Sequence, residues 1–220
     1  MANGSGCLDG CGLFCDRKLV QSNMEWILRR EHIEFLREVQ PYVKASVLLL
    51  ASGIILGWLS GAQILTVGSE FQESLGSFTE LFARLSKPML ASAIFINNGV
   101  KTFLVIVLGI LGGVLPVAFL LLNGYAIGWV LYLSIQSKGI VSSLLAVVPH
   151  GIFELPAVLL GASVGIFLGV RTMRRLFGKL ETSLRGDLGR AVGVFFRLIL
   201  PLLLLAAFVE AFVTSAIVAR

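Results

Sequence analysis

The stretch that decides the fold reads PHGIFELPAVLLGASVGIFLGVRTMRR and occupies residues 149–175. Its apolar part, residues 151–170, contains one charged side chain, Glu154. As an α-helix it is about 30 Å long, which matches the hydrocarbon thickness of a bilayer. Three arginines follow directly, and basic residues collect in the cytoplasmic loops of membrane proteins. The stretch therefore predicts a membrane-spanning helix that ends in a cytoplasmic loop.

The composition of the whole chain indicates the same class of protein. Of 220 residues, 56% are hydrophobic and 14% are charged, and the mean hydropathy is +0.90, whereas soluble domains carry about 25% charged residues. Since each span needs about 20 apolar residues, we predict an all-α, polytopic transmembrane helical bundle of about five spans. The lipid bilayer is the expected environment. The net charge of +5 does not indicate nucleic acid, because no separate basic domain carries it.

Apolar runs place the spans along the chain. The run at residues 89–122 is too long for one span, so we place the second span in its later part. We expect a short or tilted third span, then a half-helix that is re-entrant or interfacial. Spaced apolar residues within residues 66–87 predict an amphipathic helix on the outer surface or against the bundle. The predicted spans are residues 43–64, 102–122, 123–136, 151–170 and 191–218, with the half-helix at 140–148.

The first 42 residues differ from the rest of the chain. We predict that residues 1–42 form a cytoplasmic tail with an amphipathic segment that ends before Pro41, and that residues 43–220 form the transmembrane domain. No apolar run precedes residue 43, so we expect no cleavable signal peptide. The loop at residues 171–190 is strongly basic, so we expect a multi-pass protein of the cell membrane with this loop and the N-terminus in the cytoplasm. The basic residues of this loop are Arg171, Arg174, Arg175, Lys179, Arg185 and Arg190.

Glycines recur at every fourth position in four of the five predicted spans. Helices in lipid gain little by burying leucine against each other, and small residues allow close backbone contact instead. The spacing predicts tight helix packing, either within one chain or across a homo-oligomer. The glycines are Gly53, Gly57 and Gly61 in the first span, Gly109 and Gly113 in the second, Gly124 and Gly128 in the third, and Gly161, Gly165 and Gly169 in the fourth.

A few polar side chains interrupt the apolar segments, and such residues indicate sites because the bilayer interior disfavours them. His150 and Glu154 are four residues apart and share one helix face with Gly161 and Gly165. With the basic loop inside, the predicted topology brings the polar residues to the outer half of the membrane. Lys101 or a protonated His150 is the expected counter-charge for the carboxylates there. The predicted polar cluster consists of His150, Glu154, Glu210, Asn97, Asn98, Lys101 and Asn123.

Several interpretations of this cluster are open. A buried hydrogen-bonded network is the simplest, in which Asn97 or Asn98 satisfies the carbonyl of residue 152 that Pro156 leaves without a donor. A pathway for protons or ions would use the same acids. A metal site has few good ligands here, and no nucleophile with a paired base is evident. We therefore predict no catalytic residues, no metal and no cofactor.

A family resemblance begins at residues 149–156, PHGIFELP, which are followed by a span rich in Gly and Ala. This segment resembles the central motif of the stage II sporulation protein M family, and FINN at residues 95–98 and LNG at residues 122–124 follow the family's pattern in the same order. The resemblance covers residues 45–217. It implies a helical membrane protein of about five spans. Sporulating members of the family are linked to engulfment, in a membrane complex with peptidoglycan-degrading partners, and most relatives have no assigned biochemical activity.

Two functions follow for this chain. The resemblance implies a non-enzymatic scaffold or assembly factor in a membrane complex, acting as a homo-oligomer or with other membrane proteins. The polar cluster supports the alternative, a transporter or channel for ions or small molecules that uses the intramembrane His150, Glu154 and Glu210.

Three cysteines stand outside this pattern. Cys7, Cys11 and Cys15 are spaced by four in a Gly-rich start, on the predicted cytoplasmic side, where structural disulfides are disfavoured. They are weak candidates for a zinc or iron–sulfur site, with His32 as a remote fourth ligand, because their spacing differs from the usual zinc motifs. Lipidation near the membrane and an unstructured tail are the other interpretations.

Overall fold

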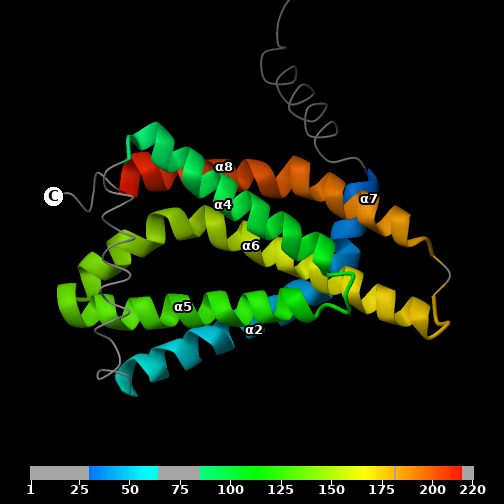
Figure 1. Cartoon of the computed structure of the whole chain (residues 1–220), viewed down its shortest axis with the longest axis horizontal. Coiled ribbons are helices and arrows are strands. Elements are labelled where there is room, and N and C mark those ends of the chain that lie inside the picture. Colours follow the sequence, from blue (N-terminus) through cyan, green and yellow to red (C-terminus); the bar gives the residue numbers. More distant parts are fainter. Residues whose placement is uncertain (1–29, 64–84, 181, 215–220) are drawn as a thin grey trace, which may run out of the picture.

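The computed structural model describes residues 30–63, 85–180 and 182–214. These ranges form a bundle of long helices (Figure 1). Its elements are α2 (Arg30–Gln63), α4 (Lys87–Leu108), α5 (Val114–Lys138), α6 (Ile140–Leu176), α7 (Leu184–Val194), the π-helical η1 (Phe195–Ile199), α8 (Leu200–Phe208) and the π-helical η2 (Val209–Thr214). The cysteine segment and most of the amphipathic helix predicted at residues 66–87 lie outside the described residues.

Five helices of the described ranges are long and apolar enough to cross a membrane, the last being the continuous rod from α7 to η2. Successive spans run in opposite directions, so α4 and α6 run one way and the other three run the other way (Figure 1). The start of α2, the α4–α5 turn and the α6–α7 connection lie at the same end, which we call the basic end. The prediction of an all-α polytopic bundle with five spans is confirmed.

Helix α2 does not end before Pro41, so that part of the sequence prediction is wrong. The helix continues through this proline to Gln63, and its range Ile33–Gly61 is long and apolar enough to cross a membrane. Pro41 is exposed, whereas Phe35 and Val39 before it and Ser46 and Leu50 after it are buried against the bundle. Packing on both sides of the proline stabilises the helix across the backbone hydrogen bond that the ring removes.

The spans between residues 89 and 148 also differ from the prediction. Gly112 and Gly113 both have φ of 77°, a left-handed conformation that glycine adopts without strain, and they reverse the chain inside the long apolar run. This turn separates α4 from α5, so the predicted span at 102–122 straddles two helices. The predicted short third span, 123–136, is the second part of α5, and the predicted half-helix, 140–148, is the first part of α6.

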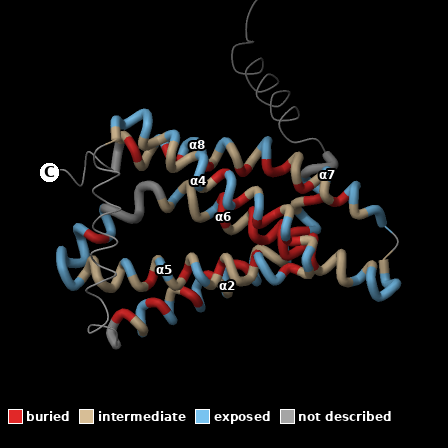
Figure 2. Tube along the Cα trace, viewed as in Figure 1, coloured by how far each residue is buried: buried red, intermediate tan, exposed pale blue. Residues whose placement is uncertain are grey.

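Helix α6 is the central element of the bundle. It packs against α2, α4, α5, α7 and α8, and it bends along its length (Figure 1). Pro149 and Pro156 lie within it, and each removes a backbone donor, which is the usual cause of such a bend. Buried residues gather toward the basic end, where α6 meets α2, α4 and the last span (Figure 2). This core includes Phe35, Ile106, Phe167, Leu168 and Ile199.

The predicted glycine stripes lie in helix–helix contacts within one chain. On α2, a Cβ atom added to Gly53 would lie 2.5 Å from the Leu121 carbonyl oxygen of α5, and one on Gly57 would overlap the Tyr125 carbonyl. Gly61 contacts the Tyr132 ring, with 2.7 Å between an added Cβ and the ring. Gly124 and Gly128 of α5 face the backbone of α2 in the same way. The two backbones are therefore as close as glycine allows.

A second backbone contact joins α6 to α4 and to the start of α5. A Cβ added to Gly109 would lie 2.6 Å from the Gly165 Cα atom, and one on Gly169 would overlap the backbone of Gly113. Gly161 contacts the methyl group of Thr102. Close approach of backbones over small residues is the main source of attraction between helices in lipid.

Replacing Gly57 with alanine tests these contacts. The added methyl group overlaps the α5 backbone, so we expect Gly57→Ala to destabilise the bundle by about 1–3 kcal/mol and to lower its Tm in detergent micelles by several degrees. Gly189→Ala is the matched control, because nothing lies within 4 Å of the added Cβ on α7 and alanine favours helix over glycine. Equal Tm values for the two variants would show that the stripe does not hold the helices.

Candidate functional site

A short chain of amide and carboxylate groups connects α4 and α6 in the bundle. The Asn98 Nδ2 atom donates a hydrogen bond of 3.0 Å to the Glu154 Oε1 atom. The Asn97 Nδ2 atom donates to the Asn98 Oδ1 atom over 3.2 Å. We call these three residues the Asn–Glu chain. Asn98 of α4 and Glu154 of α6 are 56 residues apart in sequence, and the structure brings these two members of the predicted cluster into contact.

The location of the Asn–Glu chain along the span differs from the prediction. Helix α4 begins at Lys87, so Asn97 and Asn98 lie near its middle rather than at the outer start of a span. The Asn98 amide also donates to the Glu154 carboxylate rather than to the carbonyl of residue 152. The predicted rescue of the carbonyl freed by Pro156 is therefore wrong, because the carboxylate is the stronger acceptor.

The other predicted members of the cluster lie elsewhere. Asn123 donates to the Phe119 carbonyl of its own helix over 2.7 Å, so it takes no part in the contact between α4 and α6. Lys101 is exposed on α4. Glu210 is half-buried on η2, a segment that packs against both α6 and α4. His150 lies in α6, and its side chain is outside the described part of the structure.

The Asn–Glu chain offers hydrogen bonding and proton transfer but no metal centre. Among the described residues, no group of three or more His, Cys, Asp or Glu side chains is placed to hold a metal ion. A carboxyl group accepts the Asn98 hydrogen bond in either protonation state. The Asn98 amide therefore bonds an acid inside an apolar segment without itself adding a second charge, which would be costly there.

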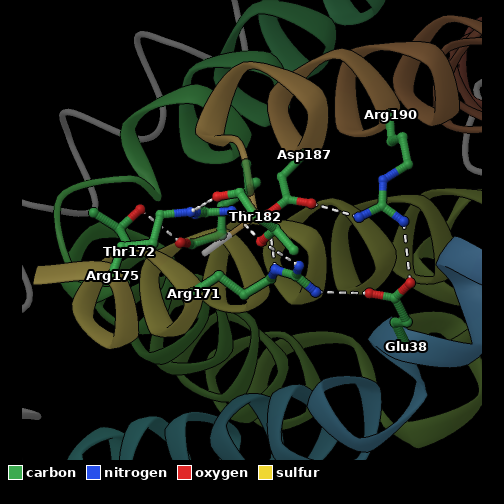
Figure 3. A network of polar contacts seen from close by, with 8 residues as sticks. Glu38, Arg171, Thr172, Arg175, Thr182, Asp187 and Arg190 are labelled. Atoms are coloured by element: carbon green, nitrogen blue, oxygen red, sulfur yellow. Dashed lines mark hydrogen bonds and ion pairs between the residues drawn. The ribbon is translucent and has the colours of Figure 1, made fainter. Parts of the chain in front are cut away.

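A second polar cluster lies at the basic end, where α6, α7 and α2 meet (Figure 3). Asp187 of α7 is 2% exposed and is surrounded by three arginines. The Arg171 Nε atom lies 2.7 Å from Asp187 Oδ2, and Arg175 and Arg190 each pair with one of the two carboxylate oxygens. Two charge-assisted hydrogen bonds, from Arg175 and Arg190, and the nearby Arg171 guanidinium compensate for the burial of this carboxylate.

Glu38 extends this cluster to α2. Its carboxylate oxygens lie 2.8 Å from Arg171 Nη1 and 3.0 Å from Arg190 Nη1. We call Glu38, Asp187, Arg171, Arg175 and Arg190 the arginine network. It joins three spans through ion pairs, so it closes the bundle at this end.

Aromatic rings support the same arginines from the core side. The Arg171 guanidinium lies 5.1 Å from the centroid of the Phe167 ring, and that of Arg190 lies 5.0 Å from the centroid of the Phe35 ring. The two rings are themselves in edge-to-face contact at 5.2 Å between centroids. Cation–π contacts of this kind help to compensate for the loss of water around each guanidinium.

Sequence reasoning missed the arginine network. It used the arginines as an orientation signal, and it placed position 38 in the amphipathic segment of the predicted cytoplasmic tail. The available signals were Asp187, an acid within the basic loop three residues before Arg190, and the i, i+4 spacing of Arg171 and Arg175 on one helix face. No sequence feature links Glu38 of α2 to these arginines, because only the fold brings Glu38 to the basic end.

Five antiparallel spans with polar groups only at selected positions define a multi-pass α-helical membrane protein. A family model described as stage II sporulation protein M matches residues 46–215, and the chain belongs to this family. No curated protein and no solved structure matches the chain. The matched region includes Asn98, Glu154 and Asp187, whereas Glu38 lies outside it.

A double-mutant cycle tests the Asn–Glu chain. We expect Asn98→Ala and Glu154→Ala to show a coupling free energy of about 0.6–1.7 kcal/mol, the range for hydrogen bonds between membrane helices. Chemical unfolding in mixed micelles measures the stability of each variant. Asn123→Ala with Glu154→Ala is the control pair, because Asn123 bonds its own helix, and it should be additive. Additivity of the Asn98 and Glu154 effects would contradict the chain.

The arginine network makes a separate prediction. Asp187→Asn removes the charge that three arginines share, so we expect a loss of about 3–5 kcal/mol in unfolding free energy. Glu38→Gln should cost about 1 kcal/mol or less, because the Glu38 side chain is 39% exposed and water screens its ion pairs. The Tm values of the two variants in the same detergent compare their losses of stability. A fall in Tm for Glu38→Gln as large as that for Asp187→Asn would refute this ranking.

Proposed function

We propose that this protein is a static membrane scaffold, a rigid five-span bundle that assembles with other membrane proteins or with further copies of itself and catalyses no reaction. The observation that carries the proposal is backbone-to-backbone contact in both helix pairs, α2 with α5 and α4 with α6. Such contacts have no spare room for one helix to slide past the other.

The arginine network supports the same function. A transporter alternates between two packings by moving one group of helices against another. Movement of α7 relative to α6 would separate Asp187 from Arg171 and Arg175, and breaking a buried ion pair is costly. The basic end therefore favours a single arrangement of α6 and α7.

The outward faces offer the surface that a scaffold needs. Large apolar side chains are exposed along α2, α4 and α8. Within a bilayer such faces contact lipid or the spans of another protein. They include Leu48, Leu56 and Leu59 on α2, Ile96, Val100 and Leu104 on α4, and Leu204, Leu205 and Phe208 on α8.

A transporter or channel is the second candidate. It is favoured by the position of the Asn–Glu chain near the middle of α4, where a carboxylate is costly and is retained most often for an ion or proton pathway. The bend of α6 beside it resembles the broken helices of transporter sites.

Cross-linking across the bundle separates the two functions. Ser46 Oγ and Ser163 Oγ are 2.8 Å apart and buried between α2 and α6, so Ser46→Cys with Ser163→Cys is suited to form a disulfide. Ser134→Cys with Ser143→Cys is the control, because these side chains meet at 2.9 Å beside the short α5–α6 connection. Both pairs are introduced after Cys7, Cys11 and Cys15 are changed to serine.

We expect both disulfides to form, the particle extracted from membranes to stay larger than a monomer, and proton and potassium flux in proteoliposomes to equal that of empty vesicles. A monomeric particle would contradict the scaffold. Flux in the parent protein that falls at least tenfold with the Ser46–Ser163 cross-link and with Glu154→Gln, but not with the control cross-link, would establish the transporter instead.

A further inference from the structure

Beside the arginine network, the basic end holds a pocket that the network does not use. The pocket has a volume of about 480 Å³ and lies between the last turns of α6 and the α4–α5 turn. Met173 of α6 and Gly112 of the turn lie across it, with 3.6 Å between the Met173 Cε atom and a Cβ added to Gly112. Its lining residues are Gly112, Val170, Met173, Arg174, Phe177 and Lys179.

The charged residues that line this pocket in the described part of the chain have one sign. They are Arg174 and Lys179, and none of the described lining residues is an acid. Arg171 and Arg175, on the same helix, are taken up by Asp187 and Glu38. In contrast, Arg174 and Lys179 are exposed and form no ion pair within the described part of the chain. Two cations that line the same pocket attract an anion.

The depth of the pocket in the membrane and its apolar lining residues indicate which kind of anion it binds. The apolar run of α6 ends at Val170, so Arg174 lies about 6 Å further along the helix axis, at the level of lipid headgroups. Phe177 is 74% exposed and Leu176 is 72% exposed beside it. The cations at headgroup level complement the charged headgroup of an acidic lipid, and the exposed apolar side chains beside them complement its acyl chains.

We propose that this pocket binds an anionic phospholipid, with Arg174 and Lys179 contacting the headgroup phosphate and Val170, Met173 and Phe177 contacting the upper acyl chains. The lipid then covers the apolar end of α6 and the Gly112–Gly113 turn, where α4, α5 and α6 meet. It would stabilise the folded protein, because a ligand that binds only the folded state shifts unfolding by mass action.

Lipid-dependent thermal stability of the full chain tests this site. Dioleoyl phosphatidylglycerol is titrated into the purified protein in neutral detergent, with dioleoyl phosphatidylcholine as the lipid of matched chains. We expect phosphatidylglycerol to raise Tm in a saturable way and phosphatidylcholine to have little effect. Each basic residue near the surface contributes a roughly fivefold gain in affinity for acidic lipid, so Arg174→Gln with Lys179→Gln should weaken binding about thirtyfold.

Lys138→Gln with Arg185→Gln is the charge-matched control, because it removes two exposed cations that do not line the pocket, and it should keep the parent affinity. Arg174→Lys keeps the positive charge, so it should retain most of the Tm shift. This variant separates the loss of the charge from a folding defect caused by any substitution at this position. An unchanged shift in the Arg174→Gln, Lys179→Gln variant, or an equal shift with phosphatidylcholine, would overturn the proposal. Glycerol 3-phosphate giving the same shift would assign the pocket to a soluble phosphate instead.

Discussion

In a bilayer, two helices gain little free energy by burying leucine against each other, so the α2–α5 and α4–α6 pairs depend on contacts that glycine alone permits. Gly57 and Gly128 bring the backbones of α2 and α5 together, and Gly109 and Gly165 do the same for α4 and α6. These contacts set the register of each pair. The Asn–Glu chain depends on the register of the α4–α6 pair, because that register brings Asn98 and Glu154 to the same height.

The two polar clusters follow different physical rules that match their positions. Near the middle of α4, a carboxylate accepts a hydrogen bond from an amide, which is a donor that adds no charge to a medium that disfavours it. At the basic end, full charges occur together, because several arginines share two acids and rest on aromatic rings. The first cluster joins α4 to α6 and the second joins α6 to α2 and α7. Polar contacts therefore join α6 to α4 at one height in the bundle and to α2 and α7 at another.

Particular residues show how far sequence reasoning reached. Asn98 and Glu154 were predicted to share one polar cluster, because few polar groups interrupt the spans and buried polar groups seek partners, but their direct hydrogen bond was not predicted. The turn between α4 and α5 was not predicted, because the Gly112–Gly113 pair, which is a turn signal, lies in a long apolar run whose glycines were interpreted as a packing stripe. Hydropathy alone reports whether a segment prefers lipid, and it does not report the backbone conformation of Gly112 and Gly113. Pro41 led to the opposite error, because it predicted a helix end where packing against the bundle keeps the helix continuous.

The sequence by itself determined the class of protein, the number of spans and the faces on which helices meet. These depend on local quantities, namely the length of apolar runs and the period of small residues along a helix. Only the tertiary structure decided which helices are neighbours, where Glu38 finds its arginines and which two cations remain to line the pocket at Gly112. Those outcomes depend on contacts between residues far apart in the chain, and each such contact exists only after several helices have packed at once.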